Sequence, residues 1–314
     1  MSAFGKESTA DEVLGGRDLS GRTFFITGGN SGLGLESGRA LAAKGAHVVL
    51  AGRDPAKLDE AAEAIQADTA EAQVETILCD LSSLASVREC GAEARERLAK
   101  IDVLINNAGI MACPFGQTKD GFERQFGTNH IGHFALTNEL LPLIEKGEAP
   151  RIVNLSSLAH IRSDVDFNDP NFERREYDKQ VAYGQSKTAN ALHAVALDAR
   201  LKARGIRAAS VHPGGIVTNL GRHLTDEDRE ALMARMAKLA EAGMAMKTIP
   251  QGAATQIWAA TALDIEAHGG AYCENCSVAE VKEDSIADGV RRYAIDPAAA
   301  ERLWTMSEKM IAAV

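Results

Sequence analysis

The sequence lacks the features that would indicate a membrane protein, a nucleic-acid binder or a disulfide scaffold. No apolar run among its 314 residues is long enough to cross a bilayer, and residues 1–7 have no signal-peptide core. Its 34 basic residues are outnumbered by 44 acidic ones, so nucleic acid and anionic membranes are not the expected partners. Five cysteines, an odd number, do not form a disulfide framework. We expect a reducing, cytoplasmic compartment and a small-molecule partner.

An internal repeat and a linker rich in Pro, Gly or Ser are also missing, so nothing divides the chain into separate domains. Its 45% hydrophobic and 25% charged residues are ordinary for a globular protein. We expect an N-terminal arm over 1–21, one main domain over 22–277 and a C-terminal extension over 278–314. The extension packs either on the body or on a partner subunit of a homo-oligomer, and the sequence does not decide between them.

Short apolar segments alternate with helical ones along the first two thirds of the chain. The segments expected to be strands are 23–27, 47–51, 74–79, 103–106, 151–155 and 207–211. Helices are expected after the first strand, from Pro55, from Ser83, over 121–145 and around Tyr183. This alternation predicts right-handed crossovers and a parallel sheet covered on both faces. The fold class is therefore α/β, a single doubly wound domain with helices on both faces.

Glycines gather in the first turn of this alternation, which reads Thr-Gly-Gly-Asn-Ser-Gly-Leu-Gly over 27–34. Glycine permits a sharp turn and close approach of the backbone to a pyrophosphate, and the following helix N-terminus adds amide donors. Because the turn joins a strand to a helix, we prefer a dinucleotide site to a flexible loop. The predicted contacts are Gly28, Asn30, Ser31, Gly32, Leu33 and Gly34.

The end of the second strand bears on which dinucleotide binds. An acidic residue there holds the ribose 2′-hydroxyl of NAD, whereas arginine accommodates the 2′-phosphate of NADP. Asp54 fits the NAD pattern, but Asp followed by Pro is also a good start for a helix. We assign Asp54 to the helix cap and Arg53 to the phosphate, with Asn30 or Ser31 as helpers. NADP is the expected cofactor and NAD the alternative.

Tyr183 and Lys187 are spaced i, i+4, so on a helix their side chains share one face. An ammonium beside a phenol favours the phenolate, lowers the pKa of the phenol and makes Tyr183 a candidate for proton transfer. Alone, such a pair more often lies on a solvated helix face. Its significance depends on the rest of the chain.

Seven motifs, including these two, follow one another over about residues 20–220. They are the glycine turn, Cys79-Asp80-Leu81, Asn106-Asn107-Ala108-Gly109, Asn129, Ser156-Ser157, Tyr183-x-x-x-Lys187 and Pro213-Gly214-Gly215-x-x-Thr218. The ordered set resembles the short-chain dehydrogenase/reductase family, which has a Rossmann-like fold and transfers hydride between nicotinamide cofactors and alcohols or carbonyls. The segments 151–160 and 270–273 resemble its retinol-dehydrogenase-like branch.

The resemblance implies a role for each matching residue. Ser157 would hydrogen-bond the substrate oxygen, and Tyr183 would pass the proton. Lys187 would bind the nicotinamide ribose, and Asn129 would hold a water leading from Lys187 to solvent. Asp80 would bind the adenine amino group. The other implied cofactor contacts are Leu81, Asn107, Ala108, Gly109, Pro213, Gly214 and Thr218.

Two segments bear on the substrate. Ser157 and Tyr183 are 26 residues apart (183 − 157), longer than is usual in the family. The segment 158–182 resembles an insertion of the retinol-dehydrogenase-like branch and is expected to lie over the substrate entrance. Residues 225–246 predict an amphipathic helix, capped by Thr225 and Asp228, within a lid over about 219–248. Its methionines favour a moderately apolar substrate.

Three other groups have competing interpretations. His130 and His133 share a helix face, but without a clear third ligand we expect core or interface histidines and no metal site. The pair Cys273 and Cys276 has no second CxxC and is interpreted as incidental. His160 faces either the substrate or its own loop.

The sequence thus predicts an NADP-preferring alcohol dehydrogenase or carbonyl reductase acting on a moderately apolar alcohol, ketone or aldehyde. An NAD-dependent enzyme of the same fold is the nearest alternative. A cofactor-binding sensor without turnover is the alternative outside enzymes. Nucleotide-sugar epimerases also use YxxxK, but their glycine loops usually have wider spacing.

Overall fold

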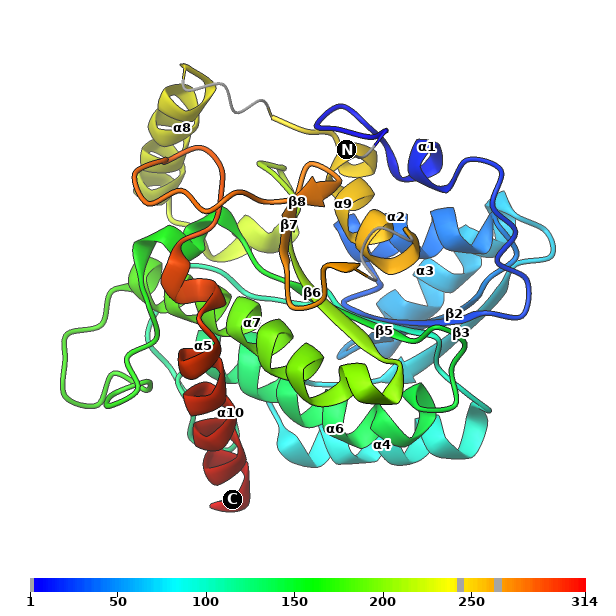
Figure 1. Cartoon of the computed structure of the whole chain (residues 1–314), viewed down its shortest axis with the longest axis horizontal. Coiled ribbons are helices and arrows are strands. Elements are labelled where there is room, and N and C mark those ends of the chain that lie inside the picture. Colours follow the sequence, from blue (N-terminus) through cyan, green and yellow to red (C-terminus); the bar gives the residue numbers. More distant parts are fainter. Residues whose placement is uncertain (1–2, 242–245, 263–266) are drawn as a thin grey trace.

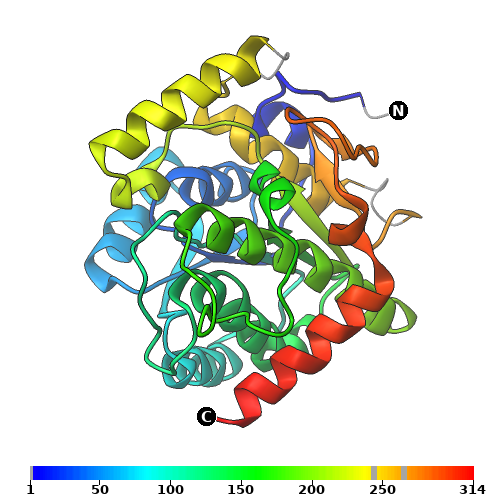
Figure 2. The same cartoon turned by 90° about the vertical axis from the view of Figure 1, so that its left-hand side faces the viewer.

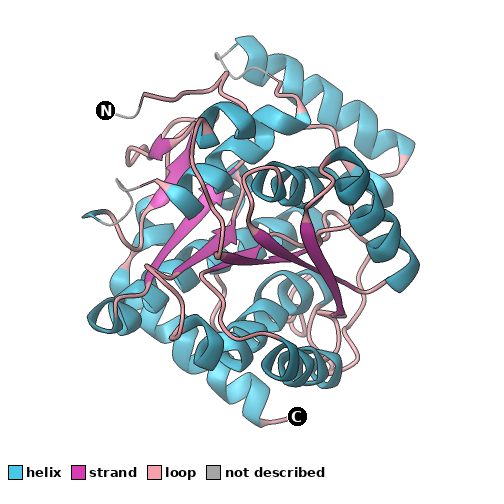
Figure 3. Ribbon diagram, turned by 90° about the vertical axis from the view of Figure 1, so that its right-hand side faces the viewer, coloured by secondary structure: helices cyan, strands magenta, loops and turns pink. Residues whose placement is uncertain are grey.

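A computed structural model describes residues 3–241, 246–262 and 267–314 of the chain (Figure 1). Eight strands form one twisted sheet in the order β3-β2-β1-β4-β5-β6-β7-β8, with helices on both sides (Figure 3). Neighbouring strands run parallel except β7 and β8. Their bounds are β1 Thr23–Thr27, β2 His47–Gly52, β3 Gln73–Leu78, β4 Val103–Asn106, β5 Arg151–Leu155, β6 Arg207–His212, β7 Tyr272–Glu274 and β8 Ser277–Val278. The predicted doubly wound α/β sheet is confirmed.

Successive residues of a strand point to opposite faces, and the two faces build two cores. Phe25 packs with residues of α4, α6, α7 and α10, whereas Phe24 and Ile26 pack with α1, α2, α3 and α9. The helices are α1 Ala10–Leu14, α2 Gly32–Ala42, α3 Pro55–Asp68, α4 Leu84–Arg97, α5 Arg124–Phe126, α6 Gly132–Ile144, α7 Lys179–Leu201, α8 Asp226–Glu241, α9 Ile249–Thr261 and α10 Pro297–Ala312. None of these described helices has the length and apolar character needed to cross a bilayer.

Both terminal segments pack on the main domain. Thr9 and Glu12 form a capping box at the start of α1, whose apolar residues are buried in the core beside α9. At the other end, α10 lies along α7 (Figures 1 and 2). The Trp304 ring packs edge-on against Phe134, with centroids 4.8 Å apart. The extension therefore completes the core of its own chain.

Two expectations about the elements were wrong. The sheet does not end at the strand 207–211, because β7 pairs with β6 and β8 pairs with β7. These strands are too short to show a periodic pattern in the sequence. They form where the chain returns to the sheet and pairs with its edge strand β6. The helix expected over 121–145 is divided into α5, a π-helical turn η1 (Gly127–Ile131) and α6.

Candidate active site

The predicted site residues gather at the carboxyl ends of the central parallel strands. The glycine turn follows β1, Asn107 follows β4, Ser157 follows β5 and Pro213 follows β6. The chain order of the strands reverses between β1 and β4, where crossovers leave on opposite sides and open a crevice. Ligands of doubly wound sheets bind at this position.

The glycine turn has the shape of a phosphate cradle. Gly28 and Gly32 have φ values of +64° and +55°, which favour glycine. A Cβ on Gly34 would lie 2.3 Å from the Gly28 carbonyl oxygen, so the loop closes only with glycine there. Ser31 is the N-cap of α2 but makes no side-chain cap hydrogen bond. The first amides of α2 are therefore available to an anion, and the residues fit the pyrophosphate of a dinucleotide.

The loop after β4 is fastened to the glycine turn. The Asn107 side-chain amide donates to the Thr27 carbonyl at 2.7 Å, and the backbone amides of Asn107 and Ala108 donate to the Thr27 hydroxyl at 2.9 and 3.0 Å. A Cβ on Gly28 would lie 3.0 Å from the Ala108 Cα. The two predicted cofactor segments thus form one rigid floor.

The residues predicted to choose the cofactor lie after β2. Asp54 is the N-cap of α3 and accepts from the Lys57 amide at 3.3 Å, with Pro55 as the first helical residue. The cap assignment is confirmed. Arg53 is exposed and has no ion-pair partner within the described part of the chain. The Asn30 side chain lies close to Gly52 at the same strand end, since a Cβ placed on Gly52 would be 3.5 Å from the Asn30 amide oxygen.

Asp80 follows β3, and its carboxylate already has partners. Ser82 donates to it from its amide at 3.0 Å and from its hydroxyl at 2.6 Å, and the Lys119 ammonium lies 3.3 Å away. The neighbouring Leu81 packs against α6, where a Cβ on Gly132 would lie 2.4 Å from the Leu81 carbonyl oxygen. Both residues border the crevice at its outer end, and the role of Asp80 toward adenine stays a prediction.

Tyr183 and Lys187 lie on the inner face of α7 and not in solvent. They are only 4% and 3% exposed, so the surface interpretation of the pair is wrong. The Lys187 ammonium donates to the Leu155 carbonyl at 2.9 Å and lies 5.6 Å from the centroid of the Tyr183 ring. The Ser157 hydroxyl lies close enough to the Tyr183 phenol to lower its pKa. Strand β5 and helix α7 therefore bring the predicted trio together.

Burial controls the protonation of this trio. It raises the pKa of Tyr183 to about 12, and the nearby Ser157 hydroxyl opposes that rise. It lowers the pKa of Lys187 to about 8. We expected Lys187 to lower the pKa of the phenol. In the folded chain the lowering comes instead from Ser157, because the ammonium is directed at the Leu155 carbonyl.

Asn129 lies in the π-helical turn between α5 and α6, a distortion common at functional sites. Its side chain exchanges two 2.9 Å hydrogen bonds with the backbone of Ile110 and donates to the Ser186 hydroxyl at 3.0 Å. A Cβ on Gly109 would lie 3.4 Å from the Asn129 amide oxygen and 3.6 Å from the Lys187 nitrogen. Asn129 therefore fixes the 107–110 loop beside Lys187, and its predicted water-holding role stays a prediction.

The loop after β6 closes the crevice from the other side. Gly214 has a φ of +105°, and the Lys247 side chain would lie 2.7 Å from a Cβ there. Thr218 caps a short 3₁₀ turn, η4 (Asn219–His223), by accepting from the Leu220 amide at 3.3 Å. Its methyl carbon would lie 3.6 Å from a Cβ on Gly32. Thr218 thus faces the glycine turn across the crevice, as expected for a residue beside the cofactor.

The helix predicted within 225–246 is present as α8, and its role as a lid stays a prediction. Thr225 and Asp228 cap it reciprocally, as expected, with the Asp228 amide 3.2 Å from the Thr225 hydroxyl. Residues 242–245 of the expected 225–246 helix lie outside the described residues. The apolar side chains of α8 are partly exposed: Met233 is 68% exposed and Leu232 is 37% exposed, whereas Leu239 is buried. A hollow of about 410 Å³ lies beside it, lined by Ile216, Val217, Met233, Met236, Met246, Lys247, Thr248 and Ile249.

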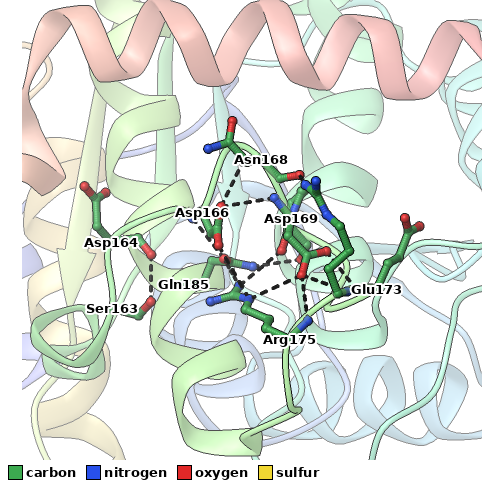
Figure 4. Close-up of polar contacts among 10 residues, drawn as sticks. Ser163, Asp164, Asp166, Asn168, Asp169, Glu173, Arg175 and Gln185 are labelled. Carbon is green, nitrogen blue, oxygen red and sulfur yellow. Dashed lines mark hydrogen bonds and ion pairs between the residues drawn. The ribbon is translucent and has the colours of Figure 1, made fainter.

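Within the segment 158–182, residues 163–178 form a loop between a 3₁₀ turn and α7, and polar contacts hold this loop in place (Figure 4). Asp169 accepts from the Glu173 amide at 2.8 Å, and Arg175 donates to Gln185 of α7 at 2.7 Å. Further along, the Tyr177 hydroxyl donates to the Cys113 carbonyl at 3.1 Å. The loop is therefore fastened to α7 and to the 113–125 segment. Sequence reasoning missed Tyr177, although a tyrosine within an acidic, arginine-containing segment was the available signal.

His130, His133, Cys273 and Cys276 have structural positions. His130 bonds the Ser307 hydroxyl and His133 bonds the Thr27 hydroxyl, both at 2.8 Å, and burial lowers their pKa values to about 3 and about 4. They are core histidines, as expected. Cys273 and Cys276 are free and buried. Across the described ranges, no three His, Cys, Asp or Glu residues are arranged to hold a metal.

His160 has a loop role. It is fully buried, and its ring bonds the Ser157 carbonyl at 2.9 Å and the Arg291 amide at 3.1 Å. His212, at the end of β6, was not singled out from the sequence. Its ring nitrogen accepts from the Leu158 amide at 3.2 Å. A histidine directly before Pro213-Gly214 was the signal that could have found it.

Comparison with known proteins follows the same motifs. A family model described as short chain dehydrogenase matches residues 22–229. The chain is 39% identical to short-chain dehydrogenase TIC 32 B, chloroplastic, from Brassica napus, over 99% of this chain and 95% of that protein. It is 37% identical to retinol dehydrogenase 13 from Mus musculus, over 96% of this chain and 88% of the relative.

Solved structures have the same fold. An uncharacterised protein from Mycobacterium paratuberculosis superposes with a TM-score of 0.71 and 36% identity, covering 96% of this chain and 97% of that one. The RhlG/NADP active-site complex from Pseudomonas aeruginosa superposes with a TM-score of 0.65 and 25% identity, covering 82% and 95%. The matches to the two relatives and to the Mycobacterium paratuberculosis structure cover 96–99% of the chain.

Proposed function

This chain belongs to the short-chain dehydrogenase family, with relatives in its retinol-dehydrogenase-like branch, and from that premise we propose an NADP-preferring oxidoreductase acting on moderately apolar alcohols or carbonyl compounds. One observation carries the proposal: Tyr183 and Lys187 are buried next to the half-buried Ser157, at the same end of the sheet as a glycine turn shaped for a dinucleotide. A binding module has no need of an aligned proton-transfer set. This argues against a sensor without turnover.

The protein would supply placement and a proton. When bound, the nicotinamide cofactor provides or accepts the hydride. Negative charge that builds on a carbonyl oxygen is stabilised by donors already in place, here the hydroxyls of Ser157 and Tyr183. With its pKa raised to about 12, Tyr183 holds its proton at neutral pH and is ready to donate it. This is the protonation state that reduction of a carbonyl requires of its proton donor.

Lys187 would hold the nicotinamide ribose. Its ammonium is anchored by the Leu155 carbonyl, and Gly109 leaves space beside it. The residues after β4 and β6 would border the nicotinamide, because they lie on either side of the trio at the ends of their strands. In this arrangement the reacting carbon would lie between the cofactor and the two hydroxyls.

The preference for NADP rests on Arg53. Asp54 is committed to the α3 cap, which leaves the guanidinium of Arg53 free to meet a 2′-phosphate. The Asn30 side chain lies at the same strand end and would add a donor. The RhlG structure is described as an NADP complex, which is consistent with this choice.

The apolar character of the substrate rests on the hollow beside α8. Ile216, Val217 and the methionines that line it offer an adaptable hydrophobic surface next to the cofactor loop. A cytoplasmic location and assembly into a homo-oligomer stay part of the proposal. The relative TIC 32 B is described as chloroplastic.

A screen of aldehydes, ketones and alcohols tests the function, with NADPH absorbance as the readout. We expect turnover of apolar carbonyls by the wild type. Tyr183→Phe should lower kcat by about 10²–10⁴-fold while the Kd for NADPH stays within about twofold. Unchanged turnover in this variant would refute the mechanism. Equal or better use of NADH would refute the role of Arg53 and favour the NAD-dependent alternative.

A further inference from the structure

Two buried histidines hold the peptide bond that follows the catalytic serine. The carbonyl oxygen of Ser157 accepts a hydrogen bond from His160 Nδ1 at 2.9 Å. The amide of Leu158, the other half of the same peptide, donates to His212 Nδ1 at 3.2 Å. One histidine comes from the 3₁₀ turn η2 (Leu158–Arg162) and the other from the end of β6. Both polar groups of this peptide, the carbonyl and the amide, are therefore held by hydrogen bonds to histidine rings.

The hydrogen bonds fix which nitrogen of each ring carries the proton. His160 Nε2 accepts from the Arg291 amide at 3.1 Å, so its proton lies on Nδ1 and is donated to Ser157. His212 Nδ1 accepts from the amides of Leu158 and, at 3.4 Å, Gly214, so its proton lies on Nε2. The opposite tautomers match the opposite polarity of the two halves of the peptide.

Both rings are neutral where they lie. His160 is fully buried and His212 is 7% exposed, and burial lowers their pKa values to about 4 and about 3. The positive charges of Arg291 near His160 and of Lys247 near His212 contribute to this lowering. A protonated ring would turn an acceptor nitrogen into a donor facing an N–H group. The lowered pKa values therefore preserve the two hydrogen bonds to the Ser157–Leu158 peptide at neutral pH.

The C-terminal extension supports this arrangement from outside. Besides the Arg291 amide, the Tyr293 hydroxyl donates to the His160 carbonyl at 2.6 Å. The Tyr272 hydroxyl of β7 lies 3.2 Å from His160 Nδ1. Arg291 and Tyr293 thus contact His160, in the turn that follows Ser157, although they lie more than a hundred positions after the catalytic residues in sequence.

We propose that His160 and His212 are positioning residues that fix the Ser157–Leu158 peptide and thereby aim the Ser157 hydroxyl at Tyr183. The proposal rests on the proposed function, because it concerns the same proton-transfer set. Ser157 also caps η2 by accepting from the Ala159 amide at 3.1 Å. Rotation of the Ser157–Leu158 peptide would break the hydrogen bond from the Ala159 amide and turn the Ser157 hydroxyl away from the Tyr183 phenol.

Paired substitutions separate positioning from simple packing. His212→Asn places an amide oxygen where Nδ1 lay and keeps the acceptor for Leu158, whereas His212→Leu removes it. His160→Asn keeps a donor for the Ser157 carbonyl, and His160→Leu does not. His193→Leu is the matched control: His193 is equally buried, bonds Asn154 at 3.2 Å, packs against Trp304 of α10 and makes no hydrogen bond to the Ser157–Leu158 peptide within the described part of the chain.

We expect both leucine variants to lower kcat about tenfold or more, with the Kd for NADPH within about twofold, and the asparagine variants to recover most of the rate. Displacement of the Ser157 hydroxyl should also raise the apparent pKa of Tyr183 in the pH profile of kcat, as Ser157→Ala should. His193→Leu should lower Tm without moving that profile. Leucine variants that behave like His193→Leu would overturn the proposal.

A second measurement does not depend on turnover. In protein labelled with ¹⁵N-histidine, the ring nitrogens at neutral pH should show His160 protonated on Nδ1 and His212 on Nε2. The reverse tautomers, or a charged ring, would contradict the two hydrogen bonds to the Ser157–Leu158 peptide. A wild type that reduces no carbonyl compound would refute the proposed function, while this spectrum would still decide whether the peptide is held as described.

Discussion

At the scale of single residues, the chemistry depends on how far each ionisable group is removed from water. Tyr183 and Lys187 share a helix face, yet their pKa values move in opposite directions because burial disfavours each charged form. Ser157 is the group that moderates the phenol. The sequence identified these partners, but only burial determines their protonation states.

The lowered pKa of Lys187 makes cofactor binding sensitive to pH. With a pKa of about 8, Lys187 is charged below that value and loses its proton as the pH rises through it. The Kd for NADPH should therefore increase above about pH 8. Fluorescence titrations from about pH 6 to about pH 10 measure this. Lys187→Met should bind more weakly and without the transition, whereas a transition that persists in the variant would assign it to another group.

Arg53 and Asp54 can be separated by substitution because they have different partners. Arg53→Ala should weaken NADPH binding about tenfold and leave NADH binding nearly unchanged, since a charge-assisted contact to the 2′-phosphate is lost. Asp54→Ala should lower Tm by a few degrees and leave the ratio of the two affinities unchanged, because it removes a helix cap. Asp54→Asn, which can still cap, is the control. An altered ratio in Asp54→Ala would restore Asp54 as a cofactor residue.

At the scale of elements, the site is assembled by loops that approach one another closely at the ends of strands. The first turn depends on glycine because the backbone of Gly28 occupies the space beside Gly34. The π-helical turn presents Asn129 to the 107–110 loop. In both cases, backbone geometry rather than side-chain chemistry makes the site possible.

Gly34→Ala should therefore disrupt the glycine turn. Its Cβ would lie 2.3 Å from a backbone oxygen that cannot move aside without reshaping the loop. We expect the Kd for NADPH to rise about tenfold or more, with a lower Tm. Gly16→Ala, at a position with no heavy atom within 4 Å of its Cβ, is the control. Wild-type binding by Gly34→Ala would show that the turn adapts.

At the scale of the whole molecule, the C-terminal extension is part of one cooperative structure. Helix α10 packs on α7, the helix that carries Tyr183 and Lys187. The preceding segment supports His160 through the Arg291 amide. Stability at the chain's end and geometry at the catalytic serine are thus linked.

Leu303→Ala tests this link. The side chain is 1% exposed and belongs to the core shared with α7, so truncation should cost about 2–5 kcal/mol in the free energy of unfolding. Urea denaturation measures the loss. Glu308→Ala on the exposed side of α10 should change the free energy by less than about 0.5 kcal/mol. A loss in Leu303→Ala as small as in Glu308→Ala would show that α10 is dispensable for the core.

The sequence by itself determined the elements and residue types that local patterns encode. The alternating apolar segments gave six of the strands, the glycine turn marked the crevice, and Asp-Pro marked the α3 cap. These features rest on periodicity, turn chemistry and capping, which act over a few neighbouring residues. The ordered motifs supplied the trio for the same reason.

Tertiary structure alone decided what depends on distant contacts. Strand β7 pairs with the edge of β6, and the π-helical turn carries Asn129 into contact with Ile110. His212 accepts a hydrogen bond from the Leu158 amide, which follows another strand, and His160 accepts one from the Arg291 amide, 131 positions away in sequence. Burial, which sets the pKa values of Tyr183 and Lys187, is a property of the packed chain and not of any local pattern.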